Sequence, residues 1–147
     1  MAMTSGLFIL NWRDLMDTSA LDVDWLDPTN IVCLFTDSFT AADLYGITAH
    51  AGLDGEVAAG GGYTQHAKQV GGTPTLALDG TEYLKYSWSA AVEWTSSTIS
   101  AEGMVISKET TTEPLIAVDF GTTYASTNGT FSISAHANGI WRIDMLP

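Results

Sequence analysis

The chain has 147 residues, enough for one domain with its own core, and its 17 acidic against 5 basic residues give a formal net charge of −12. This balance argues against binding of nucleic acid, which needs cationic groups on its phosphates, and against adhesion to an anionic membrane. No segment approaches the ~20 apolar residues of a membrane span, and no basic region precedes the apolar residues 7–10. We therefore expect a single β-rich, cytoplasmically made domain that spans residues 1–147.

The N-terminal arm, residues 1–29, differs in pattern from the rest of the chain. Apolar residues within 7–16 recur at spacings of three and four, compatible with a short amphipathic helix or with a strand that leads into one. Asp22, Asp24 and Asp27 follow as an acidic loop. Their carboxylates are candidate calcium ligands, but the EF-hand spacing and its glycine are absent, which favours a solvated loop.

From Asn30 onward the pattern becomes that of a β protein. The apolar run 31–35 lies between turn-forming residues and predicts a buried strand, in which Cys33 acts as a small hydrophobic residue. As the chain's single cysteine, it cannot form an internal disulfide. Residues 37–62, which end in three glycines, form a long connection that we interpret as a contact loop.

The second half is predicted to form short strands separated by turns. The pair Asp79-Gly80 predicts a two-residue hairpin, and Asn138-Gly139 predicts another. We expect a mainly β fold, an antiparallel β-sandwich or a partly open barrel with a short N-terminal helical segment. The predicted strands are 63–70, 73–78, 81–88, 91–94, 103–107, 115–120, 130–135 and 140–145.

The histidines do not stand at spacings typical of metal sites. His50, His66 and His136 form no i, i+4 pair and have no cysteine at zinc-ligand spacing, which favours hydrogen-bonded structural roles. The sequence contains no nucleophile elbow and no phosphate-binding loop. A pair of carboxylates could hydrolyse glycosides, but nothing singles out one pair. We therefore predict no catalytic residues, no cofactor, no metal and no enzymatic activity.

Three tryptophans in the second half allow two interpretations. Trp88, Trp94 and Trp141 could stack on a sugar ring, as in a carbohydrate- or receptor-binding module. Their positions within alternating strands favour packing in the core or against another subunit. The binding module is kept as an alternative function.

From Glu56 onward, glycine turns, an aromatic hairpin and apolar strands follow one another in a characteristic order. The motifs are EV at 56–57, GGGY at 60–63, GG at 71–72, Trp94, ISAEGMVI at 99–106, PLIAVDFG at 114–121 and FSISAHANGI at 131–140. This order resembles a family of small structural proteins encoded among the morphogenesis genes of tailed bacteriophages. The resemblance covers roughly residues 30–145.

The resemblance implies a capsid cement, or decoration, protein with a β-sandwich-like fold, no cofactor and no catalytic residues. It implies a place on the capsid surface of the virion, where the chain bridges major capsid subunits and neighbouring copies of itself and stabilises the DNA-filled head. A trimer at local three-fold axes fits the symmetry. A tail or connector component is the alternative within the same class. The side chains expected to contact partners are Phe8, Trp12, Trp25, Leu44, Tyr45 and Tyr63.

Overall fold

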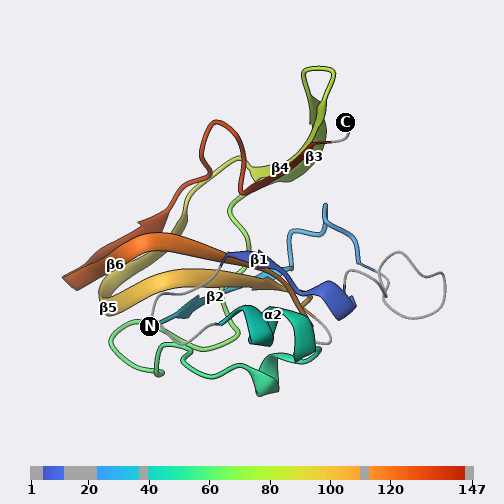
Figure 1. Ribbon diagram of the computed structural model, residues 1–147. Coiled ribbons are helices and arrows are strands. Elements are labelled where there is room, and N and C mark those ends of the chain that lie inside the picture. Colours follow the sequence, from blue (N-terminus) through green and yellow to red (C-terminus); the bar gives the residue numbers. More distant parts are fainter. Residues whose placement is uncertain (1–4, 12–22, 37–39, 110–112, 145–147) are drawn as a thin grey trace.

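The computed structural model describes residues 5–11, 23–36, 40–109 and 113–144. It confirms the predicted fold class, because the protein is mainly β with two antiparallel sheets and short helices (Figure 1). The elements are β1 (Gly6–Leu7), β2 (Ile31–Phe35), α2 (Ala41–Gly46), η1 (His50–Gly52), β3 (Pro74–Asp79), β4 (Tyr83–Trp88), β5 (Val92–Ser107), β6 (Pro114–Ile133) and β7 (Trp141–Asp144). One sheet has the order β1-β6-β5-β2 and the other the order β3-β4-β7.

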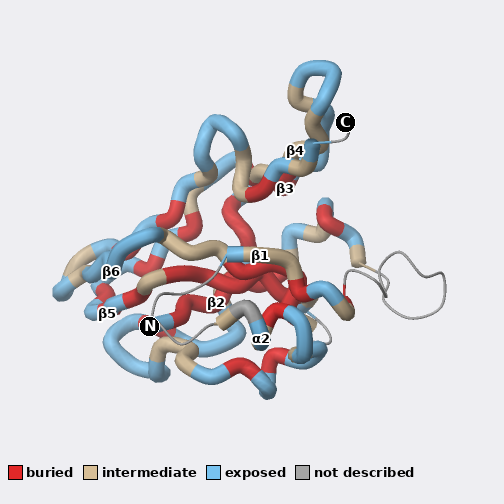
Figure 2. Tube along the Cα trace, in the orientation of Figure 1, coloured by how far each residue is buried: buried red, intermediate tan, exposed pale blue. Residues whose placement is uncertain are grey.

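β2 is buried along its whole length, as the sequence predicts (Figure 2). Its side chains alternate between the two faces of the four-stranded sheet. The even-numbered residues join a large cluster that contains most of the buried aromatic side chains, and the odd-numbered residues join a second cluster. Leu44 of α2 and Leu53 beside η1 belong to the second cluster. The strand therefore has a core on both faces, which explains its unbroken apolar sequence.

β5 and β6 form one long hairpin, where the sequence predicts four separate strands. Residues 95–102 were left outside the predicted strands, and Gly121 and Asn128-Gly129 were expected to be turns. Residues 95–102 and 121–129 pair with each other instead, and register shifts in β5 on both sides of Ser97 keep the ladder continuous through bulges. Asn128, expected in a turn, has a positive φ of 51° but lies inside β6.

The Asp79-Gly80 hairpin is confirmed, but its loop has a different length. Asp79 pairs with Tyr83, so three residues rather than two separate the paired positions. Gly80 adopts a φ of 70°, which glycine reaches without a steric penalty. The β3–β4 hairpin projects away from the four-stranded sheet (Figure 1).

The Asn138-Gly139 turn forms, but it does not join two paired strands. The Gly139 N–H donates to the His136 carbonyl at 2.8 Å, and Gly139 has a φ of 85°. The turn carries the chain from β6 to the second sheet, where β7 pairs with β4. The sequence 141–144 alternates apolar and charged residues, and in β7 Trp141 is buried while Arg142 and Asp144 are exposed.

The predicted strand 63–70 does not form. Its residues make only isolated bridges and backbone hydrogen bonds to the ends of β2, such as Val32 N–H to the Lys68 carbonyl at 2.7 Å. Left-handed backbone at Gly61, Gly62 and His66, with φ values of 54°, 83° and 55°, prevents a regular ladder.

The long connection that we interpreted as a contact loop is largely folded onto the protein. Its described residues contain α2 and η1 and bury Leu44 and Leu53. At the N-terminus, residues 9–11 are helical where a short helix was predicted, and residues 12–22 lie outside the described residues. In the described part of the chain, no helix is both long enough and apolar enough to cross a membrane.

Candidate functional site

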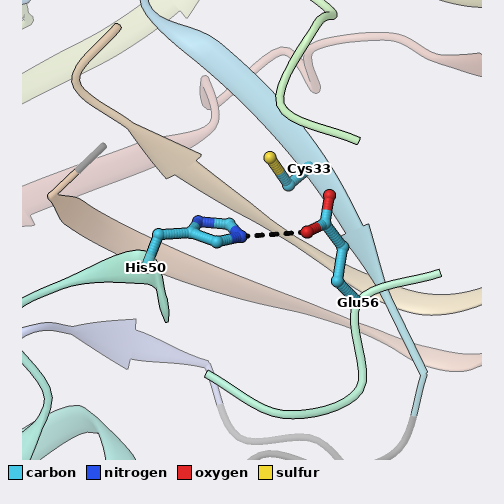
Figure 3. Close-up of side chains that lie close together, drawn as sticks. All are labelled: Cys33, His50 and Glu56. Atoms are coloured by element: carbon cyan, nitrogen blue, oxygen red, sulfur yellow. Dashed lines mark hydrogen bonds and ion pairs between the residues drawn. The ribbon is translucent and has the colours of Figure 1, made fainter. Parts of the chain in front are cut away.

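The densest group of chemically active side chains surrounds Glu56 (Figure 3). His50 Nε2 lies 3.1 Å from Glu56 Oε2, and His66 Nε2 lies 2.9 Å from the same oxygen. The side chains of His50 and Glu56 are only 3% and 8% exposed, whereas that of His66 is 37% exposed. Cys33 is fully buried beside them. One carboxylate oxygen therefore faces two imidazoles from inside the protein.

Cys33 lies in the middle of β2, and the other side chains of the group come from segments that contact this strand. His50 opens η1 with its ring 5.6 Å from that of Phe35. Glu56 forms an isolated bridge with Phe35, flanked by the hydrogen bond from Val57 N–H to the Leu34 carbonyl. These backbone contacts fix the Glu56 side chain against the strand.

The remaining polar atoms of the group also have partners. Tyr63 donates its hydroxyl to Glu56 Oε1 at 2.8 Å and accepts the Leu34 backbone N–H at 2.9 Å. His50 Nδ1 lies 3.3 Å from the buried Ser107 hydroxyl. Both oxygens of Glu56 and both ring nitrogens of His50 are thus held in fixed directions.

The surroundings set the protonation of the group. Burial alone would raise the pKa of Glu56, but hydrogen bonds from His50 and Tyr63 and the charge of His66 outweigh it and hold that pKa below its usual value. Burial, reinforced by the Glu56 charge, raises the pKa of the Cys33 thiol. The arrangement therefore contains a carboxylate beside a neutral thiol.

A cysteine, a histidine and a carboxylate are also the parts of a thiol hydrolase. A thiol nucleophile needs a lowered pKa and access to substrate, and Cys33 has a raised pKa and no exposed surface. The same three side chains offer ligand atoms that all lie within 4.8 Å of one another. Sulfur, imidazole and carboxylate are donors that transition metals accept, so the geometry suits ligation better than nucleophilic attack.

Sequence reasoning assigned the histidines separate structural roles and missed this group. The donors are spread irregularly over residues 33–66, and only the folding of η1 and the glycine-rich segment onto β2 brings them together. The sequence feature that could have indicated the cluster is the occurrence of two histidines and a glutamate in or close to the long connection. His136 does fit the structural expectation, since its Nδ1 accepts the Asn138 N–H at 3.1 Å.

The six side chains expected to contact partners fall into three groups. Tyr45 is 65% exposed on α2 and is open to a partner. Trp12 lies outside the described residues. The other four pack in the protein's own core, because large apolar side chains gain most from burial, and in this conformation they present no surface to a partner. These four are Phe8, Trp25, Leu44 and Tyr63.

Two other candidate sites of the sequence do not assemble in the described residues. Trp88, Trp94 and Trp141 are each less than 10% exposed, so they form no sugar-stacking platform. In the acidic loop, Asp24 accepts the Leu26 N–H, and Asp27 accepts two hydrogen bonds from Thr29, as in ordinary turns. The third carboxylate of that loop, Asp22, lies outside the described residues.

A shallow groove follows the surface of β6 and the residues after it. It has a volume of about 770 Å³ and is lined by Phe120, Tyr124, Thr130, Ser132 and His136, among others. Phe120 and Tyr124 pack edge to face, with ring centroids 6.1 Å apart. The groove is open and carries neither a buried charge nor a set of converging donors.

No family model matches the chain, and no curated protein or solved structure is significantly similar to it. The likeness to bacteriophage structural proteins therefore stays a prediction from the order of the sequence motifs. The structure adds the fold, the cluster around Glu56 and the exposed surfaces as independent grounds for a function.

Proposed function

We propose that the chain is a structural protein of a tailed-bacteriophage virion, bound to the capsid surface as a cement protein. In that role it bridges major capsid subunits and neighbouring copies of itself. The observation that carries the proposal is the β3–β4 hairpin, which projects from the body (Figure 1). Two of its apolar side chains, Leu76 and Leu78, are exposed. The proposal names a tailed-bacteriophage particle because of the order of the sequence motifs described above.

The second sheet has one apolar face and one charged face. Cross-strand pairing places Leu76 opposite Tyr86 and Leu78 opposite Leu84, all on one face. On the other face, the Asp79 carboxylate lies 3.6 Å from Lys85 Nζ and 3.4 Å from Arg142. Such a division is typical of a sheet that packs one side against another protein body and keeps the other side in water.

The apolar face is covered at its base and open at its tip. Trp25 packs on Tyr86 and Trp141, with ring centroids 5.0 and 5.3 Å apart. Further along the same face, Leu76 is 37% exposed and Leu78 is 76% exposed. The hydrophobic surface thus continues past the point where this chain covers it, and a neighbouring subunit would complete it.

The hairpin also offers an open edge. β3 stands at the end of its sheet, and among the described residues nothing pairs with its outer side. An unpaired strand edge is a template for pairing with another chain. On a lattice, weak contacts of this kind add up, because each bound contact raises the effective concentration for the next.

The position of the reactive side chains supports a non-catalytic role. Cys33, His50 and Glu56 lie inside the protein with at most 8% of each side chain exposed. The open β6 groove, by contrast, holds no such set of groups. The strong acidic charge further favours a location away from nucleic acid, on the outer side of a particle.

Virion composition tests the proposal directly. We expect quantitative mass spectrometry of purified particles to give a copy number comparable to that of the major capsid protein. Particles that lack the chain should lose their DNA at lower temperature or milder osmotic shock. A few copies per particle would assign the chain to the tail or connector, and its absence from particles would refute the proposal.

A further inference from the structure

We propose that Cys33, His50, Glu56 and His66 form a structural zinc site that ties the segment 50–66 to β2. The site needs no partner and no virion, so it goes beyond the proposed function and is tested on the isolated chain. Its basis is the convergence of Cys33, His50 and Glu56 inside the protein (Figure 3), with His66 on the same carboxylate oxygen as His50.

The spacing of the donors is close to that of a tetrahedral zinc site. Zinc bonds of ~2.0–2.3 Å place neighbouring ligand atoms roughly 3.3–3.6 Å apart. The ligand atoms of Cys33, His50 and Glu56 lie within 4.8 Å of one another, and the two histidine Nε2 atoms lie 3.1 and 2.9 Å from Glu56 Oε2. For Cys33, His50 and Glu56, shifts of about one ångström would therefore suffice for coordination.

The outer contacts have the form that metal ligands usually require. A ligating histidine normally donates its second ring nitrogen to an oxygen, which fixes the tautomer that coordinates the metal. His50 Nδ1 lies 3.3 Å from the Ser107 hydroxyl, which leaves Nε2 for the metal. Tyr63 holds Oε1 of Glu56 at 2.8 Å, which leaves Oε2 on the side of the two imidazoles.

His66 completes the set from the solvent side. Its backbone has a φ of 55°, an uncommon value for a residue with a side chain. Its ring lies 4.0 Å from that of His50, centroid to centroid. Because His66 is 37% exposed, it gives an ion a way in, whereas the other three donors are closed off.

The donor types select zinc over the common hard cations. Cys33 would release its proton when the metal binds. One thiolate and two imidazoles are poor ligands for calcium and magnesium, which prefer a shell of oxygens. The site also has a structural purpose, because the segment 50–66 is attached to β2 by one isolated bridge, between Glu56 and Phe35, and a few hydrogen bonds rather than by a regular ladder. A metal would add a second attachment for a segment with few backbone pairings.

Metal analysis of the purified full chain tests the proposal. The protein is stripped with a chelator, equilibrated with zinc and then dialysed, and we expect one zinc per chain and a higher melting temperature. Cobalt in place of zinc should give the intense visible bands of a tetrahedral site and a thiolate-to-cobalt charge-transfer band. Substoichiometric zinc, or a cobalt spectrum without the thiolate band, would overturn the proposal.

Variants separate coordination from folding. Cys33→Ser should abolish the charge-transfer band, and His66→Asn should weaken zinc binding while its asparagine tolerates the positive φ. Both variants should weaken zinc binding by more than the ~10–100-fold expected when Ser107→Ala removes an outer contact. His136→Asn is the matched control, since that exposed histidine lies outside the cluster and should leave binding unchanged.

Each variant is first compared with the native chain by circular dichroism in the metal-free state. If Cys33→Ser fails to fold, the half-exposed His66→Asn still decides the matter. If folded His66→Asn and Ser107→Ala both bind zinc as tightly as the native chain, the cluster is a hydrogen-bonded ion pair and not a zinc site.

Discussion

The two sheets of this protein differ in what covers them. The four-stranded sheet has a core on each face around its edge strand β2, which is buried throughout. The three-stranded sheet shares that core only at its base, where Trp25 packs on Tyr86 and Trp141. Its outer part exposes Leu76 and Leu78. Around β2 the first sheet therefore has both faces covered by this chain, while the second sheet ends in an apolar surface suited to contact with another.

Matched truncations of two leucines test this difference with the largest expected effect. Leu34→Ala removes a fully buried side chain from β2 and should lower the free energy of unfolding by ~2–5 kcal/mol. Leu78→Ala makes the same chemical change at a side chain that is 76% exposed, and it should change stability by less than ~0.5 kcal/mol. Urea denaturation measures both. Equal losses would contradict the contrast between the sheets.

The junction between the two sheets provides the next test. An added Cβ at Gly71 would collide with the backbone of Ala90, just before β5, and a backbone atom cannot move aside as a side chain can. We expect Gly71→Ala to lower stability by ~1–3 kcal/mol, the usual range for overpacking. Gly46→Ala is the control, because a Cβ there would have no atom within 4 Å. Thermal unfolding of the two variants distinguishes a rigid junction from a loose one.

The buried cluster tests whether the body depends on polar contacts as well as on its core. Tyr63→Phe removes the hydroxyl that donates to Glu56 and accepts the Leu34 N–H, so two buried polar groups lose a partner. We expect a loss of ~1–3 kcal/mol. Tyr45→Phe, on an exposed side chain, should change stability by less than ~0.5 kcal/mol. Denaturant titration measures the free energy of unfolding of both variants. Equal values for the two would show that the Tyr63 hydroxyl is dispensable.

The sequence predicts those parts of the fold that depend on local pattern. The apolar run 31–35 and the turn at Asp79-Gly80 appear where expected because hydrophobic patterning and glycine geometry act over a few residues. The long β5–β6 hairpin was divided into four strands, because Gly121 and Asn128-Gly129 look like turn residues until their cross-strand partners are known. Pairing of that kind is set by tertiary structure and not by propensity.

The candidate site was not predictable for a related reason. Cys33 was correctly expected to be buried, and nothing in its neighbourhood indicated that His50 and Glu56 would reach it. Their approach depends on η1 and on the left-handed backbone around Gly61 and His66, which carry no periodic signal. Trp25, in an apparent loop, and Tyr63, at the start of an expected strand, were predicted to contact partners, because an aromatic side chain looks available until the core that receives it is known.

A substitution at the tip of β3 should hardly change stability but should strongly reduce incorporation into particles. Leu78→Lys and Ala77→Lys place the same charge at neighbouring exposed positions of β3, on the apolar and the charged face of the sheet. Both should alter stability by less than ~0.5 kcal/mol, because neither side chain is part of the core. Only Leu78→Lys should reduce the copy number in purified particles, since a lysine there must lose its hydration when a neighbour covers the apolar face. Equal incorporation of the two variants would move the contact to another surface, and a loss with Tyr45→Lys would then place it on α2.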